Sequence, residues 1–231
     1  MDRLSAPFPA GWFTSGPEVL WGQKTTYGLI PYDMLPAIER DHFDGTFSWL
    51  PPLPPRNSAL HYDPDSDGCG LASLPALEGE AHSLGLELPK AFVHFVSTSE
   101  LYERVASCTG CYLDFSHGLI EDPSDSGGRM LRFLNDSQAC VLWYLYLTPS
   151  GDDCVLASGE WHDGARDDPK RLLNPNSYFW CAPHFESFVY RFWLEDQIWR
   201  RVRSGDVPTP EEARYLQAAV KARTRLPIPP S

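Results

Sequence analysis

The sequence predicts an α+β fold in which helices cover an antiparallel sheet, and three observations lead to this prediction. Two short helical patterns occupy residues 73–96. Several strand-like runs, separated by short turns, follow between residues 129 and 158. An amphipathic pattern over residues 183–203 then indicates a long helix. Helices and strands that are grouped in this way are typical of the α+β class.

The helical patterns before the sheet predict two helices, over residues 73–84 and 89–96. Gly85 fits the left-handed position that follows many helices, and Pro89 fits the first turn of the next helix. A third, short helix is predicted to begin at the capping-box spacing of Ser97–Glu100. The second helix should bury an apolar face formed by Phe92, Phe95 and Val96.

The strands are predicted from runs rich in aromatic, β-branched and other apolar residues. The run 138–148 is apolar on both faces, so we expect this strand to be central and covered on each side. The predicted strands cover residues 112–116, 129–134, 138–148, 154–158 and 177–181.

Two helices are predicted after the sheet. The first spans residues 183–203 and ends at Gly205. Thr209 and Glu212 have the spacing of a capping box, and Pro210 fits the first helical position, so a second helix should begin here. We expect this last helix to bury a narrow stripe formed by Ala213, Leu216 and Val220.

The length of 231 residues suits one large domain with extensions. Residues 1–70 contain many large aromatic side chains but few regular patterns, so we expect an extension that packs on the core. Residues 71–204 form the expected main domain. Residues 205–231 are expected to form a C-terminal helix and a proline-rich tail.

Residues 80–95 follow the pattern E-x-x-x-L-G-x-x-L-P-x-x-F-x-x-F. The residues that carry it are Glu80, Leu84, Gly85, Leu88, Pro89, Phe92 and Phe95. This pattern resembles the opening signature of the SUKH superfamily, which has the Smi/Knr-type immunity-protein fold. The likeness covers roughly residues 71–200. The chain then departs from the family, because STSELYERVASCTGC stands where many members continue with a short Asn-Gly loop.

The resemblance implies a SUKH-like antiparallel sheet covered by helices. It also implies a protein-binding role without catalysis. Members of this superfamily are typically immunity proteins that neutralise polymorphic toxins, often nucleases or deaminases, by covering the active site.

The formal net charge is −12 at pH 7, and residues 81–196 alone carry −9. An acidic body disfavours direct binding to nucleic acid and favours a basic protein partner, although the same charge also serves solubility alone. The sequence has no apolar run long enough to span a membrane. Residues 1–13 lack the pattern of a signal peptide, so we expect a cytoplasmic protein with reduced cysteines.

The partner we expect is a basic protein, such as a toxin domain. Opposite charge would speed the encounter and cover the surface with which a nucleic-acid-processing toxin binds its substrate. The acidic surface proposed to bind this partner consists of Glu121, Asp122, Asp125, Asp152, Asp153 and Asp163.

Cys108 and Cys111 have the spacing of half a zinc site or of a redox motif. Cys181 and His184 could complete a zinc site, because a Cys and a His three residues apart can bind one ion. A thioredoxin-like motif would follow a strand and begin a helix, whereas here a helix precedes and a strand follows. We expect ordinary reduced cysteines without a metal or cofactor, with zinc binding and redox chemistry as alternatives.

The remaining motifs are weaker. Residues 63–68 resemble the start of a calcium loop, but Leu74 stands where the final carboxylate should be. Residues 160–163 place carboxylates beside a histidine in a polar loop. The sequence lacks the nucleophile-elbow, phosphate-loop and dinucleotide motifs, so we predict a protein that is not an enzyme. A regulatory scaffold and a small metal-dependent enzyme remain the alternatives.

Overall fold

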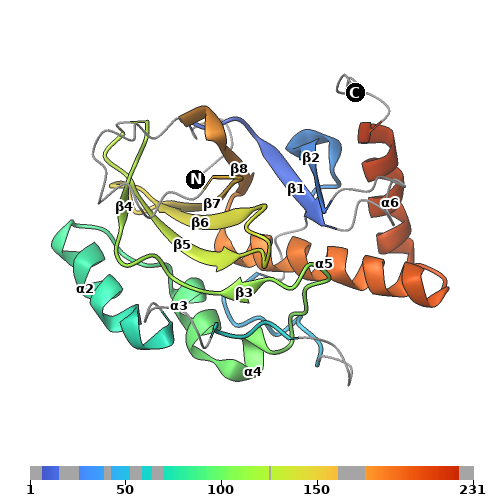
Figure 1. Cartoon of the computed structure of the whole chain (residues 1–231), viewed down its shortest axis with the longest axis horizontal. Coiled ribbons are helices and arrows are strands. Elements are labelled where there is room, and N and C mark those ends of the chain that lie inside the picture. Colours follow the sequence, from blue (N-terminus) through green and yellow to red (C-terminus); the bar gives the residue numbers. More distant parts are fainter. Residues whose placement is uncertain are drawn as a thin grey trace.

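A six-stranded antiparallel sheet with helices on one face forms the centre of the protein (Figure 1). This arrangement confirms the predicted α+β class. The computed structural model describes residues 7–15, 26–38, 43–52, 59–63, 70–124, 126–160 and 175–223.

The sheet has the strand order β3-β5-β6-β7-β8, and the short strand β4 also pairs with β5. Each neighbouring pair is antiparallel. The strands are β3 (Tyr112–Leu113), β4 (Ile120–Glu121), β5 (Arg129–Asn135), β6 (Leu142–Leu147), β7 (Asp153–Ser158) and β8 (Tyr178–Ala182).

Two of these strands are shorter than predicted. β6 begins at Leu142 rather than at residue 138, because the Asp136 carboxylate holds the residues between Asp136 and Leu142 in a turn. This carboxylate accepts hydrogen bonds of 3.1 Å from the backbone amides two and four residues later. β3 ends at Leu113, beside a bulge that shifts the register of β5.

The central position predicted for β6 is confirmed. All six of its side chains are buried, and alternate residues enter two separate hydrophobic clusters. The cluster beneath the helices includes Trp143, Leu145 and Leu147. The cluster on the other face includes Leu142, Tyr144 and Tyr146.

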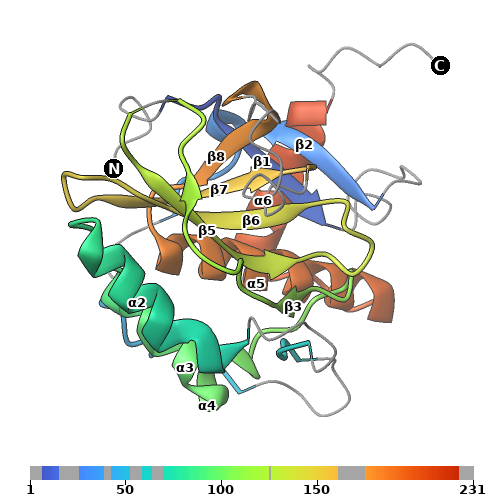
Figure 2. The same ribbon diagram turned by 60° about the vertical axis from the view of Figure 1, so that its left-hand side comes forward.

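The predicted helix pair is also confirmed. Gly85 has a φ of +71° between the two helices, as the left-handed position requires. Phe92 and Phe95 are buried and contact Phe185, with ring centroids 5.0 and 5.6 Å apart. The helices beneath the sheet in Figures 1 and 2 are α2 (Leu74–Ser83), α3 (Lys90–Ser97), α4 (Ser99–Tyr102) and α5 (Phe185–Ser204).

The last helix, α6 (Pro210–Arg223), begins with the predicted capping box. The Thr209 amide donates to Glu212 at 2.6 Å, and the Glu212 amide donates to the Thr209 hydroxyl at 3.2 Å. The predicted buried stripe is wrong, since Val220 is exposed. The helix is rotated because Tyr215 donates a hydrogen bond to the buried Glu195 of α5. The side that is buried carries Glu212, Tyr215, Ala219 and Ala222.

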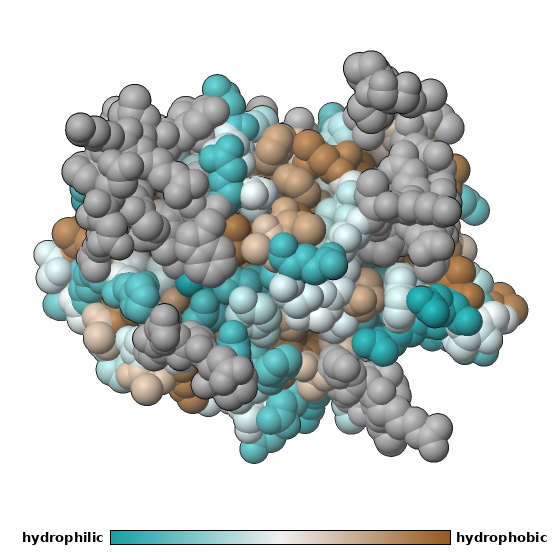
Figure 3. All heavy atoms as spheres, viewed as in Figure 1, coloured by the Kyte–Doolittle hydropathy of each residue, from teal (hydrophilic) through white to brown (hydrophobic). Residues whose placement is uncertain are grey.

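The first 70 residues contain a hairpin of β1 (Gly11–Ser15) and β2 (Tyr27–Pro31). Figure 1 shows it between the sheet and α6, and in the same view Figure 3 shows apolar residues over this region. Trp12 and Ile30 from this hairpin are buried in the same cluster as the sheet. Short 3-10 helices occupy Tyr32–Met34, Leu71–Ser73 and Pro175–Ser177.

The same N-terminal part of the chain contacts both edges of the sheet. At one edge, the Pro9 carbonyl accepts a hydrogen bond of 2.8 Å from the Trp180 amide of β8. At the other edge, the His61 carbonyl accepts a hydrogen bond of 2.8 Å from the Leu113 amide of β3. These contacts occupy backbone groups that an edge strand would otherwise offer to another chain.

Candidate functional site

One end of the sheet brings together three of the six residues that were proposed to contact a partner. A row of paired residues runs across β5 and β6, from Glu121 on β4 to Asp153 on β7. Asp152, in the turn before β7, is exposed. The Glu121 side chain is 85% exposed and lies 3.8 Å from Arg129. We call Glu121, Asp152 and Asp153 the acidic edge.

Asp122 does not belong to this exposed surface, because the residue is only 6% exposed. Its carboxylate holds the following loop by accepting hydrogen bonds from Ser124 and Ser126, and it accepts another from the Tyr146 hydroxyl at 2.9 Å. Burial raises the pKa of Asp122, but these hydrogen bonds outweigh burial and lower the pKa below its ordinary value. The charge therefore organises a turn. Asp125 and Asp163 lie outside the described residues.

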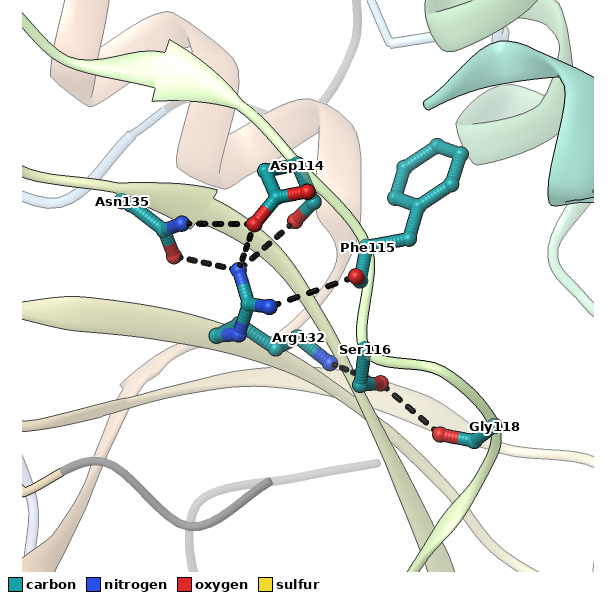
Figure 4. Close-up of polar contacts among 6 residues, drawn as sticks. All are labelled: Asp114, Phe115, Ser116, Gly118, Arg132 and Asn135. Carbon is teal, nitrogen blue, oxygen red and sulfur yellow. Dashed lines mark hydrogen bonds and ion pairs between the residues drawn. The ribbon is translucent and has the colours of Figure 1, made fainter. Parts of the chain in front are cut away.

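A buried arginine fixes the loop that leads into β4 and therefore positions Glu121 (Figure 4). Arg132 is 3% exposed, and its guanidinium donates to the Asp114 carboxylate at 2.7 Å and to the Phe115 carbonyl at 3.2 Å. Asn135 accepts another hydrogen bond of 2.7 Å from the same group. The acceptors come from residues 114–115, just before β4, so this network anchors the start of the acidic edge.

The Glu80 carboxylate anchors the other end of this loop. It accepts a hydrogen bond of 3.1 Å from the Leu119 amide, one residue before β4 begins. Glu80 is the first residue of the motif that runs to Phe95, and α2 carries it to the loop. The motif thus contributes to the placement of the acidic edge as well as to the core.

A cavity of about 650 Å³ adjoins the acidic edge at Asp153. It lies between the segment 43–46, the first half of α3 and the start of α5. We call it the edge cavity. Its charged and titratable lining residues are Asp44, Asp153 and Glu186, together with Lys90, His94 and His184. With neutral histidines, the described lining holds three carboxylates and one ammonium group, so this lining carries negative charge.

Two contacts shape the edge cavity. The buried Glu186 carboxylate accepts hydrogen bonds from the Gly45 amide at 2.7 Å and from the Trp49 indole at 2.9 Å. Glu186 therefore connects the segment that contains Gly45 and Trp49 to the first turn of α5. The helix dipole also favours a carboxylate at this position. His184 Nδ1 lies 4.0 Å from an Asp153 oxygen, within reach of an ion pair when the imidazole is protonated.

The cysteine pair does not have the properties of a redox motif. Burial raises the pKa of the Cys108 thiol to about 12 and that of the Cys111 thiol to about 11. A redox-active cysteine needs a lowered pKa, because the thiolate is the reactive form. Cys111 is held in a polar turn, in which its amide donates to the Ser107 hydroxyl at 3.0 Å.

These pKa values predict slow reaction of Cys108 and Cys111 with a thiol reagent such as DTNB at pH 8. Among the described cysteines, Cys140 is the exposed one and should react first. The Cys140→Ala variant should lose one equivalent of the fast phase, while a Cys108→Ala variant should keep it. Mass spectrometry of the labelled protein identifies the modified residue. Labelling of Cys111 before Cys140 would contradict this interpretation.

The four residues of the metal-site alternative are not brought together. Cys181 is buried in β8 and donates a hydrogen bond to the Val155 carbonyl, with sulfur and oxygen 3.2 Å apart. His184 lies beside Asp153 at the edge cavity. No three His, Cys, Asp or Glu side chains form a metal-binding group in the part of the chain that the structure describes. Most of the calcium-like loop, residues 64–69, lies outside that part.

The sequence analysis did not identify Asp44 and Glu186, which line the edge cavity, or Arg132, which anchors the loop before β4. Asp44 stands next to a glycine in an N-terminal segment without a regular pattern, so it gave no local signal. Glu186 is the second residue of α5. An acidic residue in the first turn of a helix is usually interpreted as interacting with the helix dipole. Arg132 interrupts an apolar strand, which is a signal for a buried, paired charge.

Comparisons of the chain with protein-family models, with curated proteins and with solved structures found no match. Among the described residues, no helix has the length and apolar character needed to cross a membrane. The fold and the site together define an α+β protein with an acidic edge and an adjoining acidic cavity at one end of its sheet.

Proposed function

We propose that this chain is a non-catalytic, cytoplasmic protein that binds a basic partner protein through its acidic edge and edge cavity. The observation that carries the proposal is the position of Asp153. It ends the cross-strand row that begins at Glu121, and it also lines the edge cavity. Asp153, whose side chain is 18% exposed, therefore belongs both to the acidic edge and to the acidic recess.

The two parts would act at different stages of binding. The exposed carboxylates of Glu121 and Asp152 would attract a basic surface over a distance and raise the rate of association. The edge cavity would then accept a Lys or Arg side chain of the partner beside Asp44 and Asp153. Charged groups in a recess are less screened by salt than exposed ones, so this contact would slow dissociation.

The resemblance to the SUKH superfamily supports a more specific form of the proposal. An immunity protein of this kind would neutralise a toxin of the nuclease or deaminase class by covering its basic active-site face. The net charge of −12 suits such a partner, because an enzyme that acts on nucleic acid usually presents positive charge to its substrate.

Recovery of a partner with matched baits tests the proposal. Wild-type protein and a Glu121→Lys/Asp152→Lys variant would be used to capture proteins from the source cells. A Glu100→Lys/Glu103→Lys variant is the control, since it makes the same change in charge at exposed residues on and just after α4. A basic protein should be retained by the wild type and by the control, and lost from the edge variant.

Two outcomes would contradict the proposal. One is a partner that the edge variant retains as well as the wild type does. The other is a catalytic turnover that survives purification and is unaffected by the edge substitutions. Circular dichroism of each bait would establish that loss of the partner does not result from unfolding.

A further inference from the structure

A second cavity, of about 470 Å³, lies between α5, α6 and an N-terminal part of the chain that contributes residues 36–38, Phe43 and Trp49. It shares only Phe43 with the edge cavity, and the two cavities are lined by different parts of α5. We call it the helix cavity. A volume of this size is typical of sites for small molecules.

The wall of the helix cavity is largely aromatic. Trp49 packs against Tyr190 with ring centroids 5.0 Å apart and against Trp193 at 5.7 Å. Phe43 contacts Tyr190 at 5.5 Å, and the Tyr190 hydroxyl donates to the Glu211 carboxylate. Rings that are held in place by one another offer flat, apolar surface at little cost in conformational entropy. This wall suits a flat, apolar group.

Two arginines give the helix cavity a positive wall. Arg191 on α5 is only 1% exposed, whereas Arg214 on α6 is exposed. Glu211 is the single carboxylate among the described lining residues. The described lining therefore carries a net positive charge, although the whole chain carries −12.

The charge of Arg191 has little compensation within the described part of the chain. Its Nη2 donates to the Pro36 carbonyl at 3.1 Å, while Nε and Nη1 have no hydrogen-bond partner. The rings of Trp12, Tyr32 and Tyr215 lie 5.0–5.7 Å from the guanidinium carbon. Aromatic faces stabilise a buried cation less than a carboxylate does, so Arg191 is held here without an ion pair to a described carboxylate.

The nearest buried carboxylate on α5 is already occupied. Glu195, one helical turn after Arg191, accepts hydrogen bonds from the Trp12 indole at 2.9 Å, the Ser15 amide at 3.0 Å and the Tyr215 hydroxyl at 2.7 Å. These neutral donors satisfy Glu195 without the guanidinium. Glu195 offsets part of the Arg191 charge without bonding to the guanidinium, so an anion in the helix cavity would meet a guanidinium whose Nε and Nη1 have no hydrogen-bond partner.

We infer that the helix cavity binds a small aromatic carboxylate. Its flat ring packs against Trp49, Tyr190 and Trp193. Its carboxylate lies on the side of the two arginines, where Arg214 is accessible for direct contact and Arg191 contributes through its field. This site is separate from the proposed partner surface and does not depend on the proposed function.

Calorimetric titration of the full chain with 2-naphthoate and with 2-naphthamide tests the inference. The two probes have nearly the same shape, and only the first carries a negative charge. We expect one equivalent of 2-naphthoate to bind, with 2-naphthamide about tenfold weaker. Equal affinity for the two probes, or no binding of either at millimolar concentration, would overturn the inference.

Three variants locate the binding site. Arg214→Ala should lower the affinity for 2-naphthoate about fivefold, because it removes an exposed positive charge. The affinity for 2-naphthamide should stay unchanged. Lys221→Ala removes a charge from the same helix outside the lining and should change neither affinity. Ala37→Trp places a large side chain at an exposed position of the lining and should abolish the binding of both probes. If 2-naphthoate binds the Ala37→Trp variant as it binds the wild type, the site lies elsewhere.

Discussion

Replacement of Phe92 by alanine should lower the free energy of unfolding by about 3–5 kcal/mol, because it opens a cavity in the main core. Phe92 is fully buried, and its ring lies 5.0 Å from Phe185, 5.8 Å from Phe133 and 6.0 Å from Phe115. The side chain therefore joins α3 to β5, to α5 and to the loop before β4. Urea unfolding followed by circular dichroism measures the change.

A matched substitution on the same helix gives the control. His94→Ala changes an exposed residue two positions later and should alter the free energy of unfolding by no more than about 0.5 kcal/mol. Similar stability of the Phe92→Ala and wild-type proteins would show that α3 does not pack on the sheet. The helix pair of the fold, and with it the family assignment based on residues 80–95, would then be wrong.

Replacement of Asp114 by alanine should also cost about 3–5 kcal/mol, because it leaves the buried guanidinium of Arg132 without its carboxylate. The remaining acceptors, which include the Asn135 side chain and the Phe115 carbonyl, are neutral. Removal of one partner of a buried ion pair costs more than the pair contributes, since the other charge stays desolvated.

The pair of Glu121, which is exposed, and Arg129, which is partly exposed, is the control for this prediction. These two side chains lie 3.8 Å apart on neighbouring strands, and Glu121→Ala should cost no more than about 1 kcal/mol. Asp114→Ala should additionally loosen the loop before β4, which amide hydrogen exchange at residues 115–121 would detect. If Asp114→Ala lowers the free energy of unfolding by no more than Glu121→Ala does, water must solvate Arg132, which would contradict the prediction.

The elements around the sheet could be predicted from the sequence because their signals are local. Gly85 and Pro89 separate α2 from α3, and Thr209 with Glu212 begins α6. The two apolar faces of β6 predicted its central position. In each case, residues within one segment determine the outcome through periodicity, capping or turn geometry.

The buried polar side of α5 and the buried side of α6 were not predicted, because both depend on residues in other segments of the chain. Arg191 and Glu195 stand on α5, but they are buried by Trp12 and Tyr215. A helix with a polar side normally exposes it, but Trp12, which is 183 residues from Glu195, and Tyr215, which is 20 residues from it, bury this one. The buried side of α6 was misplaced for the same reason, because Tyr215 reaches Glu195.

The candidate site was predicted in part. Glu121, Asp152 and Asp153 were found from charge alone, and antiparallel pairing gathers them at one end of the sheet. Asp122 was assigned to the same surface because its loop is acidic and rich in serine and glycine. Those serines donate hydrogen bonds to Asp122, so the composition that suggested a solvated loop instead supplies its internal partners.

If the acidic edge attracts a basic partner, as we propose, the rate of association with that partner should depend on the salt concentration. The wild type and the Glu100→Lys/Glu103→Lys control should associate fastest at low salt. Both should slow as the Debye length shortens to about 10 Å at 0.1 M salt. The Glu121→Lys/Asp152→Lys variant should associate about tenfold more slowly at low salt and depend less on salt. Equal rates and equal salt dependence for all three proteins would contradict the claim.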